Sequence, residues 1–155
     1  MLASLRQTLF MHWLDSQLKT LYQLAEAYEQ CRVNNSDDYV EEIRQSRTAF
    51  IDKVQSLVDS VVKQPNISGC VAGHEGLILA KAGLVSDSDA LGAMIQESMS
   101  IAQRSKELLD LGSIQQIVIV GENNKVAMIS VGQLTLSILS PKNTNLAKSL
   151  SNKPH

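Results

Sequence analysis

Apolar residues recur at steps of three and four in two early segments of the chain, which is the spacing of one helix face. The segments cover residues 14–28 and 40–61, and Arg47 is the one polar interruption of the second stripe. Turn-forming residues 34–38 separate the segments, and Pro65 ends the second one. We therefore expect an antiparallel helical hairpin. Its apolar positions are Leu14, Leu18, Leu21, Ala25 and Tyr28, then Val40, Ile43, Phe50, Val54, Leu57 and Val61, with Phe10, Met11 and Tyr22 widening the first face.

The pattern changes to short apolar runs after Pro65, and these runs predict β-strands. The expected strands are residues 67–72, 77–82, 114–120, 125–131 and 134–139. Helical spacing returns at residues 90–109, between a run of capping residues and Gly112, a glycine suited to a helix end. A short last helix capped by Asn143 is expected to run through Leu150. The order helix, two strands, helix, three strands, helix predicts an α/β fold ending in an antiparallel meander.

The helix expected at residues 90–109 has more apolar surface than one sheet can cover. The line that would face the sheet comprises Leu91, Ile95, Ala102 and Leu109, and a second line to one side comprises Met94, Ile101 and Leu108. Together they span about 180°, whereas a helix buried on one face needs about 100°. Either the N-terminal hairpin covers the second line, or a second copy of the chain covers it across a two-fold axis. We favour the second explanation and expect a homodimer.

Composition and charge narrow the classes of function. The 155 residues carry a net charge of -2, without the basic stripe that a nucleic-acid backbone requires, so nucleic acid is excluded as the main ligand. No secretory leader or spanning apolar run is visible, and we expect a cytoplasmic protein. Cys31 and Cys70 form neither a disulfide framework nor a zinc motif.

The sequence contains none of the common catalytic or metal-binding motifs. The sequence has no phosphate-binding loop, nucleophile elbow or zinc-protease motif, and His12, His74 and His155 are isolated from one another. We therefore expect no enzyme, no cofactor and no metal.

From residue 46 to residue 150 the chain resembles the roadblock/dynein light chain family. The resemblance is carried by the glycine-containing hairpin with residues 76–80 and Gly83, the helix at 91–109, the strands at 117–120, 126–129 and 136–139, and Asn145-Leu146. It implies a five-stranded antiparallel sheet with helices on both faces, dimerising through the central helix and the strand after it. Members of the family bind Ras-like GTPases, dynein parts or other scaffold subunits, and some bacterial members activate GTPases.

These observations predict a non-catalytic, dimeric protein-interaction scaffold that regulates a small Ras-like GTPase or binds another scaffold subunit. We divide the chain into an N-terminal helical extension (1–45), a roadblock-like domain (46–150) and a disordered tail (151–155). The candidate interface residues are Met94, Ser98, Ile101, Arg104, Ser105, Leu108 and Gln116.

Two other classes of function stay open. One is a small-molecule sensor, although the aromatic residues that usually line such pockets all lie before residue 51. The other is a membrane-surface adaptor anchored by the first helix through Trp13, although that helix lacks the basic polar face of such anchors.

Overall fold

The computed structural model describes residues 12–34, 40–74, 76–85, 87–131 and 134–151. The elements are helices α2 (His12–Asn34) and α3 (Val40–Val62), strands β1 (Gly69–His74) and β2 (Leu77–Gly83), helix α4 (Ser88–Leu109), strands β3 (Gln116–Val120), β4 (Asn124–Val131) and β5 (Leu134–Pro141), and helix α5 (Leu146–Ser149). The predicted order of helices and strands is confirmed. The predictions for Phe10, Met11, most of the first turn and most of the C-terminal tail lie outside the described residues.

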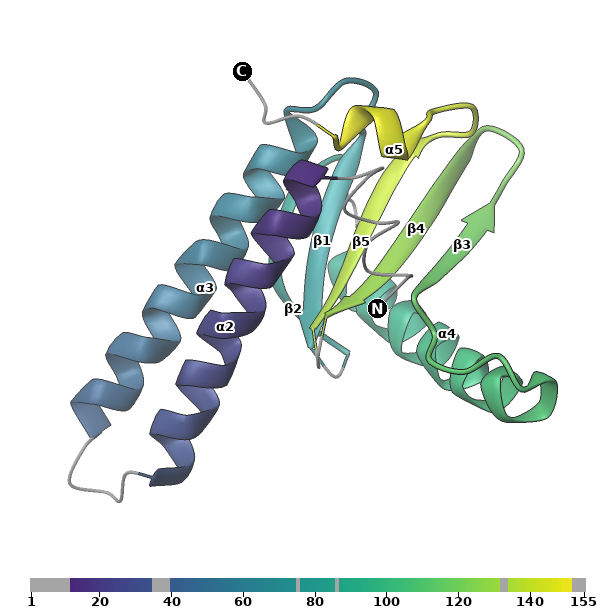
Figure 1. The fold of residues 1–155 in the computed structure, drawn as a ribbon. Coiled ribbons are helices and arrows are strands. Elements are labelled where there is room, and N and C mark those ends of the chain that lie inside the picture. The colour runs from purple at the N-terminus through teal and green to yellow at the C-terminus, as the bar shows by residue number, and fades with distance from the viewer. Residues whose placement is uncertain (1–11, 35–39, 75, 86, 132–133, 152–155) are drawn as a thin grey trace.

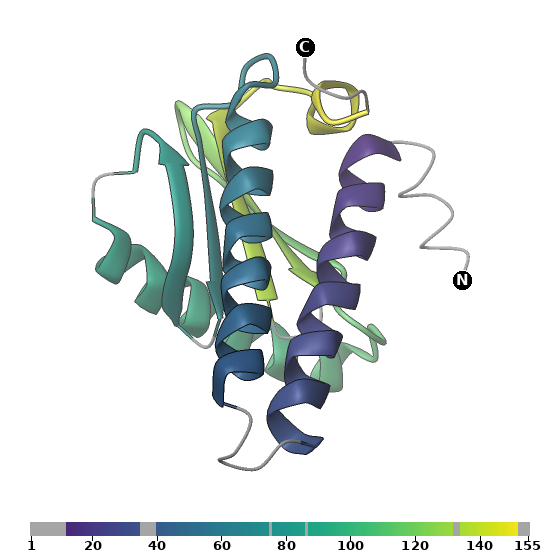
Figure 2. The same cartoon turned by 90° about the vertical axis from the view of Figure 1, so that its left-hand side faces the viewer.

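The five strands form one sheet in the order β2-β1-β5-β4-β3, and every neighbouring pair is antiparallel. The α2–α3 hairpin lies on one face of this sheet and α4 lies on the other (Figure 1). Figure 2 looks onto the hairpin, with the sheet behind it and α4 farther back. This arrangement confirms the expected fold class and leaves β2 and β3 as the two edge strands.

The main core lies between the hairpin and the sheet, because the apolar stripes of both helices face the same way. Its buried residues are Trp13, Leu14, Leu18 and Leu21 from α2, Val54, Leu57, Val58 and Val61 from α3, and Cys70, Ala72, Ala80, Ile129, Leu134, Leu136 and Ile138 from the sheet, with Leu150. Trp13 is only 8% exposed. Its burial removes the main feature behind a membrane anchor, and none of the described helices is long and apolar enough to cross a bilayer.

Hydrogen bonds join α2 to α3 and to the chain segment after α5. The Lys53 ammonium on α3 donates to Gln17 Oε1 on α2 at 3.1 Å. At the start of α2, the backbone N–H of Trp13 donates to the carbonyl of Ser151 at 3.3 Å, and that of Leu14 donates to the carbonyl of Leu150 at 3.4 Å. Two N–H groups of the first helical turn, which have no acceptor inside the helix, are thereby satisfied by the chain segment after α5.

One detail of the hairpin differs from the sequence-based expectation. Tyr22 was expected to widen the apolar face of α2, but it is 44% exposed. Its hydroxyl donates to Glu26 Oε1, and this hydrogen bond with the nearby negative charge raises the pKa of Tyr22. Helix α3 runs without interruption through residues 45 and 46, as the helical spacing over residues 40–61 predicts.

The ends of several elements also differ from the prediction, and β3, for example, starts at Gln116 instead of residue 114. Strand β1 starts at Gly69 instead of residue 67, because the chain turns at Asn66 with φ of 63°. Helix α5 is capped by Asn145, whose side chain accepts from the Lys148 N–H at 3.1 Å, and not by Asn143. Helix α4 ends on Asp110 in the left-handed conformation, two residues before the glycine expected in that role.

Candidate protein interface

Helix α4 is held on the sheet by its first two turns. The Asp87 side chain accepts a hydrogen bond from the Ala90 N–H at 3.0 Å, which satisfies a donor at the helix start. A Cβ atom at Gly92 would lie 2.4 Å from the carbonyl oxygen of Gly76, so only glycine lets the helix approach the β1–β2 turn this closely. One turn later, Ile95 is 4% exposed against the sheet.

The C-terminal half of α4 is covered less completely. Met99 still contacts the sheet, where its sulfur lies 3.7 Å from the hydroxyl of Ser130 on β4. Leu109 was expected to face the sheet, but it is 67% exposed. Leu109 is the last residue of α4, and this end of the helix projects past β3, as Figure 1 shows.

The second apolar line of α4 is open to solvent. Met94, Ile101 and Leu108 are 37%, 48% and 85% exposed. The N-terminal hairpin lies on the opposite face of the sheet, so the explanation that it covers this line is wrong (Figure 1). Between the exposed side chains lie Ser98 and Ser105, both half-buried, and the Ser105 hydroxyl donates to the carbonyl of Ile101 at 3.0 Å.

Strand β3 adds a second exposed apolar surface. Val118, Ile119 and Val120 are 47%, 44% and 56% exposed, and Gln116 at the start of the strand is also exposed. The sequence-based set of interface residues contained Gln116 and missed the other three. The available signal was the uninterrupted run of four β-branched residues, because a strand exposed to water usually alternates apolar with polar side chains.

The two edges of the sheet differ in how they are protected from further strand pairing. Strand β2 has a bulge opposite Ala72 and Gly73 and an exposed lysine, Lys81. Gln55 of α3 donates through Nε2 to the carbonyl of Lys81 at 3.2 Å, which occupies an acceptor on that edge. Strand β3 pairs with β4 in unbroken register and contains no charged residue, proline or glycine. Of the two edges, β3 is therefore the one open to another strand.

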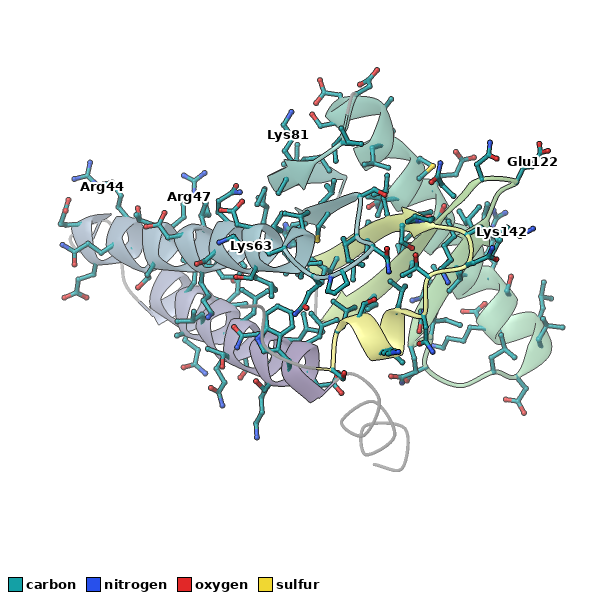
Figure 3. All side chains as sticks on the ribbon, turned by 90° about the horizontal axis from the view of Figure 1, so that it is seen from above. Arg44, Arg47, Lys63, Lys81, Glu122 and Lys142 are labelled. Carbon is teal, nitrogen blue, oxygen red and sulfur yellow. The ribbon has the colours of Figure 1, made fainter. Side chains whose placement is uncertain are left out.

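Charged side chains do not mark a different site among the described residues. Figure 3 shows the labelled charges dispersed over the molecule. Arg44 and Arg47 lie on α3 and Lys81 on β2, whereas Glu122, between β3 and β4, and Lys142, just after β5, lie away from the hairpin. Within the described residues no three His, Cys, Asp or Glu side chains are grouped as metal ligands would be. Arg104, the charged member of the candidate set, is exposed on α4. The candidate site is therefore the apolar flank of α4 together with β3.

Comparisons with known proteins agree with this architecture. A family model described as Roadblock/LC7 domain matches residues 53–140, more than half of the chain. The uncharacterized protein MJ0714 of Methanocaldococcus jannaschii is 31% identical over 100 residues, which cover 60% of this chain and 84% of that protein. The match to the family starts inside α3, so α2 and the first part of α3 lie outside it.

Solved structures share the fold at low sequence identity. The Roadblock/LC7 domain from Streptomyces avermitilis is similar with a TM-score of 0.56 and 19% identity, over 61% of this chain and 82% of that one. MglB of Myxococcus xanthus is similar with a TM-score of 0.58 and 17% identity, over 62% of this chain and 75% of that one. With the family match over the sheet and α4, these likenesses lead to one assignment: the chain belongs to the Roadblock/LC7 domain family.

Proposed function

We propose that this protein is a non-catalytic interaction module that works as a homodimer, with α4 and β3 of one copy against α4 and β3 of another. The observation that carries the proposal is the line of Met94, Ile101 and Leu108, which is exposed along one side of α4. The C-terminal half of α4 passes β3, whose unprotected edge offers backbone hydrogen bonds to a second copy of itself (Figure 1). Gln116, Ser98 and Ser105 belong to the same proposed interface.

The energetics favour using both surfaces together. Covering the three side chains on each copy contributes several kcal/mol, at about 2 kcal/mol for each fully buried side chain. Association itself costs about 4–15 kcal/mol, so the helix contact alone gives at best a weak dimer. Pairing β3 with its symmetry mate supplies main-chain hydrogen bonds and covers part of Val118, Ile119 and Val120. The two contacts together make one continuous interface on two elements.

The oligomeric state tests the proposal directly. We expect light scattering after gel filtration to give twice the 17.0 kDa chain mass at micromolar concentration. Ile101→Glu places two carboxylates in the middle of the interface and is expected to give a folded monomer, because a buried unpaired charge is strongly unfavourable. Gln103→Glu, on the exposed polar side of α4, is the matched control and should stay dimeric. A wild-type monomer at this concentration would refute the homodimer.

We further propose that the dimer binds a small Ras-like GTPase or another scaffold subunit. The support is membership of the family, whose members are similar to this chain over the sheet and α4. Affinity capture with the wild-type protein, beside Ile101→Glu as control, should recover a partner that contains a phosphate-binding loop of the form GxxxxGK[ST]. A phosphate-release assay with that partner then separates an activator, which accelerates hydrolysis, from a passive platform. Recovery of the same proteins by both variants would contradict a dimer-dependent partner.

A small-molecule sensor has less support. A cavity of about 450 Å³ lies beside β2, but it is open to solvent. Its walls are residues 76–81 with Gln55, Ser88 and Asp89, and none of these lining residues is aromatic. Small-molecule pockets are usually enclosed and largely apolar, so this cavity does not favour a ligand.

We also propose that the chain divides into an N-terminal extension, a family domain and a short tail.

A further inference from the structure

Two opposite charges border the exposed apolar line of α4 on its solvent side. At 100° per residue, Glu97 and Arg104 both lie just beyond Met94, Ile101 and Leu108, away from the side that faces the sheet. Both side chains are exposed. They are two helical turns apart, about 10.5 Å along the axis, which is too far for an ion pair within the helix. Among the described residues neither has an ion-pair partner.

We infer that Glu97 of one copy pairs with Arg104 of the second copy, and Arg104 with Glu97, so that the partner α4 is held antiparallel. The inference rests on the proposed homodimer. In a two-fold interface, if residue i meets residue j then j meets i, so both pairs form together. Ile101 lies between Glu97 and Arg104 along the helix. If the two-fold axis passes near Ile101, the two α4 helices run antiparallel, and Glu97 of each copy faces Arg104 of the other. A parallel helix would instead place Glu97 beside Glu97 and Arg104 beside Arg104.

The side chains between the charges are compatible with a close helix contact. Ser98 and Ser105 are small, and they lie between the exposed line and the line that faces the sheet. The Ser105 hydroxyl already donates to the carbonyl of Ile101 in its own helix, so covering it leaves no hydrogen-bond donor without an acceptor. A close approach keeps the long arginine side chain within reach of the facing carboxylate. The partner that fits is a second copy of this chain, because it presents the same acid and base at the same spacing.

The test is a charge exchange between two variants. Glu97→Arg gives a chain with two positive charges on the border, and Arg104→Glu gives a chain with two negative charges. Each variant alone is expected to dimerise about tenfold more weakly than wild type, because two attractive pairs become repulsive. Mixed in equal amounts, they should form a heterodimer well above the statistical half, measured by native mass spectrometry with one chain isotopically labelled. The excess should shrink at high salt.

The controls separate this inference from the homodimer itself. Glu107→Arg changes the net charge as Glu97→Arg does, but it lies on the polar arc away from the border and should not alter dimerisation. The double variant with both exchanges should recover wild-type affinity. If wild type is dimeric and the two single variants mix only statistically, the ion pairs are refuted and the homodimer stands. If wild type is monomeric, the homodimer is refuted and the pairing with it.

Discussion

Replacing Leu14 with alanine tests whether α2 belongs to the same folding unit as the family domain that follows it. Leu14 is 0% exposed and lies in one apolar cluster with Val58 of α3 and Leu136 of β5. Leucine-to-alanine changes in well-packed cores cost about 3–5 kcal/mol, because the surrounding residues fill the cavity only in part. A domain of ordinary stability has about 5–15 kcal/mol in total. The substitution should therefore remove a large share of the free energy of unfolding.

Urea unfolding followed by two signals measures this effect. Trp13, the single tryptophan, reports on the start of α2, while far-UV circular dichroism reports on all helices and strands. We expect the two transitions to coincide in wild type and in Leu14→Ala, with a lower midpoint and an unchanged slope in the variant. Gln23→Ala, at an exposed position of the same helix, should change stability by less than about 0.5 kcal/mol. A tryptophan transition that precedes the other, or a loss below about 1 kcal/mol, would show that α2 is a separately melting appendage.

Two further substitutions test other contacts. Gly92→Ala should destabilise the protein by about 1–2 kcal/mol, because overpacking against the Gly76 carbonyl exceeds the gain in helix propensity; equal or higher stability in urea would contradict the close contact. Burial raises the pKa of the Cys70 thiol, so the folded protein keeps it protonated at pH values where the unfolded chain ionises it. The contribution of the buried Cys70 thiol to the free energy of unfolding is therefore complete below the unfolded pKa of about 8.5, and it is lost as the pH rises above that value. In a Cys31→Ser background, the stability advantage over Cys70→Ala should shrink between pH 7 and pH 10, and a constant difference would refute this reasoning.

Most elements could be predicted because their signals are local. The spacing of apolar residues located both helices of the hairpin, all five strands and α4, since helix and strand periods differ within a few residues. The start of α5 could not be chosen this way, because Asn143 and Asn145 are equally good caps in sequence. The choice depends on Thr144, which is buried and donates through its hydroxyl to the carbonyl of Asn66 at 3.4 Å. That long-range contact holds the preceding residues in a turn and delays the helix.

The candidate interface was predictable on α4 and less so on β3. The angular position of Met94, Ile101 and Leu108 follows from helix geometry alone, and their exposure then required only that the hairpin lie elsewhere. The exposure of Val118 depends instead on which strand ends the sheet. An uninterrupted apolar strand is typical of a strand covered on both faces, and its place in the strand order is set by pairings between distant segments. The local spacing of apolar residues does not predict those pairings.

The hydrogen bonds from Trp13 and Leu14 to the carbonyls of Ser151 and Leu150 also constrain the time at which the fold is completed. Translation proceeds from the N-terminus, so α2 leaves the ribosome before any of the sheet it covers. Its final acceptors are made only after β5 and α5. The apolar face of α2 therefore cannot be fully buried, and its first two N–H groups cannot reach these acceptors, until nearly the whole described chain has been synthesised. Helix α2, which lies outside the matched family region, is therefore translated before the sheet that it covers, and its last two backbone hydrogen bonds form only after the sheet is complete.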